Sequence, residues 1–211
     1  MERIGGPSIR PRAGLSGREV DVVDPAYVKD FFESVSTEWD EMRSSFYNEG
    51  VIDALAQHTG ADASMTIVDV GTGTGFVAAG LASRVARVIG IDNSPAMLSV
   101  ASDNLVALGV DNVELVEGDL TRLPVEPATA DGAVANMVLH HAPDPLAMLV
   151  EMARVTRPGG WVAITDEVEH SYEWMRTEQA DLWLGFTEDE VAGFFADARL
   201  VEYGYASLGM Q

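Results

Sequence analysis

The residues with the clearest chemical meaning form a glycine-rich turn, DVGTGTG, at positions 69–75. The turn follows the apolar run at 65–68 and precedes a helical pattern at 76–82. A strand that turns sharply through glycines into a helix brings backbone N–H groups and the positive end of a helix against a ligand, and nucleotide-like cofactors are held in this way. This turn is therefore the predicted functional centre.

The spacing of the glycines indicates which cofactor the turn holds. A dinucleotide-binding turn needs G-x-G-x-x-G, whose third glycine would fall on Phe76, whereas the glycines here are Gly71, Gly73 and Gly75. A phosphate-binding P-loop is excluded because no Gly-Lys pair follows the turn. The Asp69 carboxylate at the strand end would repel a pyrophosphate but suits a ligand that carries an ammonium and a sulfonium group. These features indicate S-adenosylmethionine.

Four further segments follow the turn in order along the chain. They are GIDNS at 90–94, EGDL at 117–120, DGAVAN at 131–136 with LHH at 139–141, and RVTRPGG at 154–160. Together with the turn, they resemble the five ordered motifs of the class I S-adenosylmethionine-dependent methyltransferases. The segment 169–186 also resembles methyltransferase domains attached to repressors of the arsenic-sensor type, and a similarity to quinone C-methyltransferases is broader.

The resemblance implies a role for each motif. Asp92, at the second strand end, would accept both ribose hydroxyls of the cofactor, and Asp119 would accept the adenine amino group. Met97 and Leu120 would enclose the adenine ring or belong to the core, and Asn136 would lie near the methionine end. The predicted cofactor-binding residues are Asp69, Gly71, Thr72, Gly73, Gly75, Asp92, Asn93, Met97, Gly118, Asp119, Leu120, Asn136 and Met137.

Methyl transfer from a sulfonium is an in-line displacement, so catalysis rests mostly on proximity, alignment and desolvation. A general base is needed only where the nucleophile starts protonated. His141 and His170 follow predicted strands and are the candidate catalytic residues, with packing or a solvated loop as the alternative for each. We expect no metal site.

The composition indicates one acidic domain. The chain has 211 residues, 47% of them hydrophobic, which suffices for a sizeable core. A net charge of −21 would repel a phosphate backbone, so we expect no nucleic-acid partner. The absence of cysteine excludes disulfides, thiolate metal sites and iron–sulfur clusters, and therefore radical chemistry on the same cofactor. With no long apolar run and no apolar leader, we expect a cytoplasmic protein that does not contact a membrane.

Short apolar runs alternate with helical patterns through the middle of the chain. The expected strands are 66–70, 86–91, 113–117, 131–136 and 161–165, and helical stretches lie near 75–83, 95–108 and 145–156. This alternation predicts an α/β fold with a Rossmann-like, doubly wound, mostly parallel sheet. We expect residues 1–20 to be a mobile tail, 21–60 to form N-terminal cap helices, and 61–211 to form the cofactor-binding methyltransferase domain.

The C-terminal part departs from the resembled family. Helical patterns at 171–184 and 188–197 precede a predicted sixth strand at 199–206. The seventh, antiparallel strand of the family is missing from this sequence. A six-stranded sheet would leave an open edge, so we expect a homodimer if these residues are the whole protein.

Two functions are open at this point. The first is a methyltransferase that moves a methyl group from S-adenosylmethionine to oxygen, nitrogen or carbon of a small-molecule acceptor. The second is a non-catalytic protein that binds S-adenosylmethionine or S-adenosylhomocysteine as a partner in a complex. A nicotinamide oxidoreductase is disfavoured by Phe76 in place of the third glycine.

Overall fold

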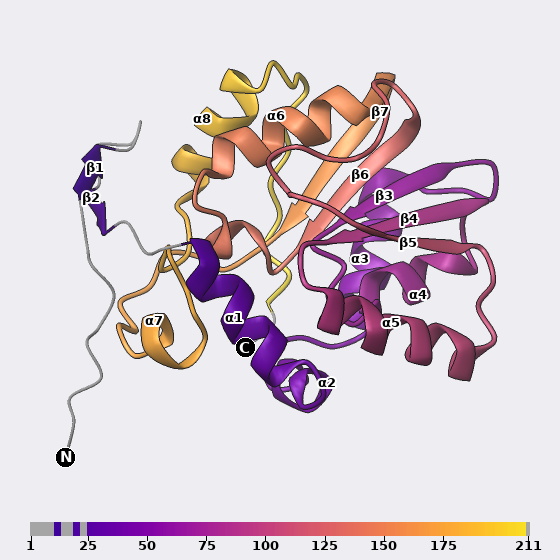
Figure 1. Ribbon diagram of the computed structural model, residues 1–211. Coiled ribbons are helices and arrows are strands. Elements are labelled where there is room, and N and C mark those ends of the chain that lie inside the picture. Colours follow the sequence, from indigo (N-terminus) through magenta and orange to yellow (C-terminus); the bar gives the residue numbers. More distant parts are fainter. Residues whose placement is uncertain (1–10, 14–18, 22–24, 210–211) are drawn as a thin grey trace.

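A parallel sheet with helices on both faces forms the body of the protein (Figure 1). The computed structural model describes residues 11–13, 19–21 and 25–209. The strands of the sheet are β3 (Thr66–Val70), β4 (Arg87–Asp92), β5 (Val113–Glu117), β6 (Ala130–Asn136) and β7 (Thr156–Thr165). Their spatial order is β5-β4-β3-β6-β7, and every neighbouring pair is parallel. The predicted Rossmann-like α/β fold is confirmed, although β7 starts earlier than predicted.

Two of the longer helices begin where the sequence places capping residues. The side chain of Ser94 caps α5 (Pro95–Leu108), and that of Asp144 caps α6 (Pro145–Val155), each with proline at the first helical position. These signals explain why both helix starts could be predicted. The other helices are α1 (Pro25–Val35), α2 (Trp39–Arg43), α3 (Gly50–Thr59), α4 (Phe76–Ala82), α7 (Met175–Glu178) and α8 (Glu188–Asp197).

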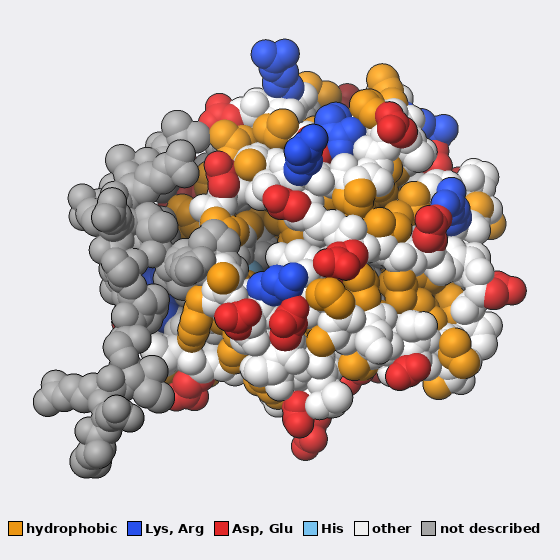
Figure 2. All heavy atoms as spheres, in the orientation of Figure 1, with side chains coloured by type: hydrophobic (Ala, Val, Ile, Leu, Met, Phe, Trp, Pro, Cys, Tyr) orange, Lys and Arg blue, Asp and Glu red, His pale blue; other side chains and the backbone are white. Residues whose placement is uncertain are grey.

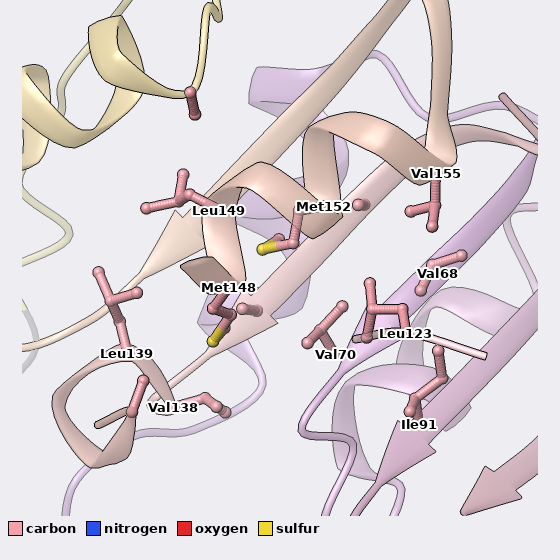
Figure 3. Packing of buried hydrophobic residues seen from close by; sticks show 14 of the residues in the cluster. Val68, Val70, Ile91, Leu123, Val138, Leu139, Met148, Leu149, Met152 and Val155 are labelled. Carbon is pink, nitrogen blue, oxygen red and sulfur yellow. The ribbon is translucent and has the colours of Figure 1, made fainter. Parts of the chain in front are cut away.

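One face of the sheet packs against α6 (Figure 3). Val68 and Val70 of β3 and Ile91 of β4 point to this face, because alternate residues of a strand share a side. Met148 and Met152 come from the same face of α6, and all five side chains are fully buried. Each such side chain stabilises the fold by roughly 1.5–3 kcal/mol. The helix therefore fixes the strands whose ends carry the predicted site.

The opposite face packs against α3 and α4. Ile67, Val88 and Val134 point from three neighbouring strands to this side. The two helices approach each other closely at Gly80, where a Cβ would lie only 2.7 Å from Cδ1 of Ile52. A side chain at this position would require Ile52 to move from its place between the helices.

The range 21–60, predicted to form an N-terminal cap, contains α1, α2 and α3. The chain before α1 contains two short strands, β1 (Pro11–Ala13) and β2 (Glu19–Asp21), which pair antiparallel. The rest of the predicted tail at 1–20 lies outside the described residues. The proposed boundaries between tail, cap and domain stay a prediction.

The predicted sixth strand at 199–206 is wrong. Arg199 and Glu202 have φ angles of 62° and 58°, a left-handed backbone that interrupts an extended strand. Residues 201–209 are all exposed and pair with no strand. The sheet of the described residues therefore has five strands, with β7 at one edge. The homodimer stays a prediction.

The predicted helix at 171–184 is largely wrong, because α7 covers only four of its residues. Ala180 has a φ of 61°, which ends helical geometry before the apolar residues that follow. The N–H groups of Leu182 and Trp183 both donate to the carbonyl of His140, at 3.0 Å. This segment is thus a buried loop tied to the end of β6.

Candidate functional site

The chain order of the sheet reverses between β3 and β6, because β4 and β5 extend to one side of β3 and β6 and β7 to the other. Ligands of open α/β sheets bind at such a point, outside the carboxyl ends of the strands. A cavity of about 780 Å³ lies there. All of the predicted cofactor-binding residues except Gly75 line this cavity, and so does His141. Residues predicted from the ends of four strands therefore lie together around one cavity.

The glycines of the turn allow other parts of the protein to pack closely against it, and two of the turn's N–H groups donate to the protein rather than to a ligand. The N–H groups of Gly71 and Thr72 both donate to the carbonyl of Ile91, at 2.8 and 2.9 Å, so they do not face a ligand as the sequence suggested. Gly71 has a φ of 70°, and a Cβ on it would lie 2.6 Å from a methyl group of Val138. Gly75 also has a positive φ and is the N-cap residue that precedes α4. Its role is structural, because a Cβ there would meet the neighbouring helix α5 rather than the cavity.

Asp92 and Asp119 follow neighbouring strands and line the same part of the cavity. Oδ1 of Asp92 accepts the N–H of Ser94, and Oδ2 accepts that of Gly73, each at 2.9 Å. Burial raises the pKa of the Asp92 carboxyl, while these N–H groups oppose the shift. Oδ1 of Asp119 accepts both the N–H and the hydroxyl of Thr121, which orients the carboxylate.

Asp69 is the buried acid at the end of β3. Its Oδ2 accepts the hydroxyl of Thr72 at 2.6 Å, and burial raises the pKa of the carboxyl to about 7. A cationic ligand in the cavity would favour the ionised form. Asp69 is therefore poised to change its charge when such a ligand binds.

Aromatic residues of the cap cover the cavity. Phe32, Trp39 and Tyr47 all line it, and the indole nitrogen of Trp39 lies 3.9 Å from the place of a Cβ on Gly73. Burial raises the pKa of the Tyr47 hydroxyl to about 12, so it stays protonated. The cap thus covers the cavity on the side of the glycine-rich turn.

A carboxylate ties the cap to the turn. Oδ1 of Asp40 accepts the hydroxyl of Thr74 at 2.8 Å, and Oδ2 accepts the amide of Asn104 at 2.9 Å. Arg43 donates to the same carboxylate at 2.8 Å and lies over the ring of Phe76, 3.8 Å from its centroid. The short helix α2 is therefore held over the site by polar contacts.

His141 lies on a 3₁₀ turn, η1 (Leu139–His141), directly after β6. Its Nδ1 is 3.2 Å from the carbonyl of Ala180, to which it donates, and its ring packs edge-on against Phe32. Burial and the neighbouring His140 hold the pKa of His141 well below its usual range. The ring is therefore neutral near pH 7, with the proton on Nδ1 and a lone pair on Nε2.

The second candidate, His170, does not line the cavity. Its Nε2 lies 2.8 Å from Oε2 of Glu167, and its ring stacks on Tyr172. His140, next to His141, donates from Nδ1 to Asp166 at 2.8 Å. Although burial favours the neutral ring, Asp166 raises the pKa of His140 to about 9. Of the two predicted catalytic histidines, His141 thus lines the cavity and His170 lies outside it.

Sequence reasoning missed several residues of the site. Thr74, Glu117, Thr121 and Asp144 line the cavity and had no assigned role. It also missed Asp181, whose carboxylate oxygens are buried with no hydrogen-bond partner among the described residues. A single acid inside the apolar run ADLWLGF at 180–186 was the available signal.

Charge in the cavity is mostly negative. The lining includes five carboxylates, from Asp69, Asp92, Glu117, Asp119 and Asp144, against one lysine, Lys29. On the face seen in Figure 2, basic side chains are scattered among acidic and hydrophobic ones rather than gathered in a patch. This balance suits a cationic ligand better than a phosphate.

Among the described residues, no helix has the length and apolar character needed to cross a membrane.

Comparison with protein families matches residues 68–164, which carry this cavity, to a methyltransferase domain. The chain carries a class I S-adenosylmethionine-dependent methyltransferase domain. The domain is 36% identical over 107 residues to an arsenite methyltransferase of Halobacterium salinarum, covering 49% of this chain and 27% of that protein. It is 34% identical over 149 residues to a ubiquinone biosynthesis O-methyltransferase of Paracidovorax citrulli, covering 66% of this chain and 60% of that protein.

A solved structure of similar fold is an S-adenosylmethionine-dependent methyltransferase from Aquifex aeolicus. The methyltransferase domain matches it with a TM-score of 0.61 and 26% identity, over 84% of this chain and 88% of that one. The chain thus spans 27% and 60% of the two curated relatives above, although it covers most of this solved structure. The family and its cofactor agree with the resemblance noted in the sequence.

Proposed function

We propose that the protein transfers a methyl group from S-adenosylmethionine to oxygen, nitrogen or carbon of a small-molecule acceptor. The observation that carries the proposal is the cavity at the strand-order reversal, which combines the glycine-rich turn and strand-end acids with a neutral histidine and an aromatic cover. Its volume of about 780 Å³ is within the range of ligand sites, roughly 300–1,000 Å³.

Each acid has a part in holding the cofactor. Asp92 accepts the ribose hydroxyls through the lone pairs that Ser94 and Gly73 leave open. Asp119 accepts the adenine amino group, and Met97 and Leu120 lie against the ring. Asp69 favours the positive charge of the methionine portion. Asn136 and Met137, at the end of β6, place the methyl group.

The transfer needs little covalent chemistry from the protein. A lone pair of the acceptor forms a bond to the methyl carbon while the carbon–sulfur pair returns to sulfur, leaving S-adenosylhomocysteine. The cap residues Phe32 and Trp39 exclude water and align the partners. His141 takes the acceptor's proton on Nε2 when the nucleophile starts protonated.

The acceptor is proposed to be small because it must reach His141 inside the cavity. The similarity to a ubiquinone biosynthesis O-methyltransferase supports oxygen as one kind of acceptor atom. Arsenite has less support because the chain has no cysteine to bind it as a thiolate complex.

Methyl transfer to extract metabolites tests the proposal. The wild-type chain and Asp92→Ala are incubated with methyl-labelled S-adenosylmethionine and a metabolite extract, and labelled products are separated. We expect one or a few products that depend on wild-type protein and are reduced with the variant. Binding of S-adenosylhomocysteine without any labelled product would favour the non-catalytic binding protein.

A further inference from the structure

The feature that the proposed function leaves unexplained is the carboxylate of Asp181. Its side chain has no exposed surface, and neither oxygen has a hydrogen-bond partner among the described residues. The two nearest ring nitrogens, His140 Nε2 and His141 Nδ1, lie 3.8 and 3.9 Å from Oδ1, beyond hydrogen-bond distance. These are ion-pair distances, but a buried carboxylate that accepts no hydrogen bond is still costly, so its position needs a cause.

Other metal-ligating groups converge on this carboxylate. The ligand atoms of Glu167, His170 and Asp181 all lie within 4.8 Å of one another. His140 belongs to a different group with His141 and Asp181, and its Nδ1 donates to Asp166.

The backbone holds these groups in place. The N–H of Phe186 donates to the carbonyl of Glu167, and that of His170 to the carbonyl of Leu184, both at 3.0 Å. Gly185 lies so close to Val168 that a Cβ on it would be 2.4 Å from the carbonyl oxygen. These contacts fix the two segments that carry the carboxylates and imidazole, and a rigid frame is what a metal site needs.

We propose that Glu167, His170 and Asp181 bind a divalent transition-metal cation. One imidazole with two carboxylates suits zinc and other divalent transition metals, whereas calcium and magnesium take oxygen ligands. His170 Nε2 and Glu167 Oε2 are hydrogen-bonded at 2.8 Å, so they separate slightly to reach the roughly 3.3 Å expected between tetrahedral zinc ligands.

A metal ion on Nε2 of His170 would require that nitrogen to be unprotonated. On binding, the proton of His170 moves from Nε2 to Nδ1, and the hydrogen bond that Nδ1 accepts from the N–H of Tyr172 at 3.2 Å is lost. The alternative set of His140, His141 and Asp181 is less suitable, because Nδ1 of His141 donates to Ala180. The cation would lie behind His141 and hold the loop that encloses it.

The proposal is independent of methyl transfer, so metal binding itself is measured. The full chain is treated with chelator and titrated with Co²⁺, followed by visible absorption, with Zn²⁺ as competitor. Asp181→Asn and Glu167→Gln test two ligands by changes of similar shape. Glu173→Gln, a neighbouring exposed acid paired with Arg176, is the matched control. Circular dichroism checks that each variant is folded.

The expected result is one Co²⁺ per wild-type chain, displaced by Zn²⁺, with affinity reduced at least about 100-fold in each folded ligand variant and kept in the control. Because Glu167 is nearer the surface than Asp181, Glu167→Gln decides the matter if Asp181→Asn does not fold. No stoichiometric Co²⁺ binding by folded wild-type protein, or wild-type binding by Glu167→Gln, would overturn the proposal.

Discussion

The side chain of Asp92 accepts a hydrogen bond from the backbone N–H of Gly73 at 2.9 Å. The acid at the end of β4 therefore orients the glycine-rich turn after β3, and the two motifs act as one unit. In the proposed complex, the same carboxylate also receives the ribose hydroxyls, so it links the shape of the turn to cofactor affinity.

Replacing Asp92 with alanine is expected to weaken binding of S-adenosylhomocysteine by about tenfold to several hundredfold. Hydrogen bonds to a charged acceptor contribute roughly 1.5–3 kcal/mol each, and the turn also loses its contact with Gly73. Calorimetry on the folded variant measures the effect. Asp103→Ala, which removes an exposed acid of α5, is the control and should bind like wild type. Unchanged affinity in folded Asp92→Ala would disprove this role.

Replacing Asp40 with alanine is expected to loosen the cap. Its carboxylate joins α2 to Thr74 and Asn104, and because it is partly exposed, we expect the free energy of unfolding to fall by only about 1 kcal/mol. Affinity for S-adenosylhomocysteine should fall as well, since the cap covers the turn. Glu41→Ala, the exposed next residue, is the matched comparison in urea denaturation and in calorimetry. Equal effects of the two substitutions would mean that Asp40 does not fasten the cap.

Affinity for S-adenosylmethionine should depend on pH through Asp69. The pKa of its carboxyl is raised by burial to about 7, and the cationic cofactor favours the ionised form, so affinity rises with pH by up to about tenfold per unit below pH 7. In the free protein the sign is opposite: the stability contributed by protonated Asp69 is fully present below pH 3.8, and is lost as the pH rises through 7.

Asp69→Asn provides the comparison for both effects. Titrations of the variant from pH 5.5 to 8.5 should give a flatter affinity profile, and its unfolding should vary less with pH over the same range. A profile identical to that of wild type would show that another group carries the pH dependence.

Replacing His141 with asparagine is expected to slow methyl transfer to a hydroxyl or carbon acceptor by roughly 10²–10⁴-fold, because the acceptor's proton then has no base. Single-turnover rates from pH 6 to 9 measure this once an acceptor is known. His58→Asn, at an exposed position of α3, is the control. A wild-type rate in His141→Asn across that range would leave His141 a packing role only.

The lining of the cavity at the strand ends could be predicted largely from sequence, because its residues come directly at the ends of strands. Asp69, Asp92 and Asn136 each end a short apolar run, and parallel strands bring such ends to one edge. The directions of the amides in the turn could not be predicted, since those of Gly71 and Thr72 pair with Ile91 from another strand.

The cluster around Asp181 could not be predicted from local sequence patterns. Its contacts with His140 and Glu167 join segments far apart in the chain, and the intervening apolar spacing is the same for a helix and a buried loop. The left-handed backbone at Ala180 and Arg199 decided against the predicted helix and strand, and neither residue type signals such a conformation.

Calorimetric titration of the wild-type chain with S-adenosylhomocysteine and, separately, with NAD tests the central claim most directly. The glycine spacing, the strand-end acids and the acidic cavity predict one S-adenosylhomocysteine bound per chain and no heat of binding from NAD. Binding of NAD together with no binding of S-adenosylhomocysteine would contradict the account.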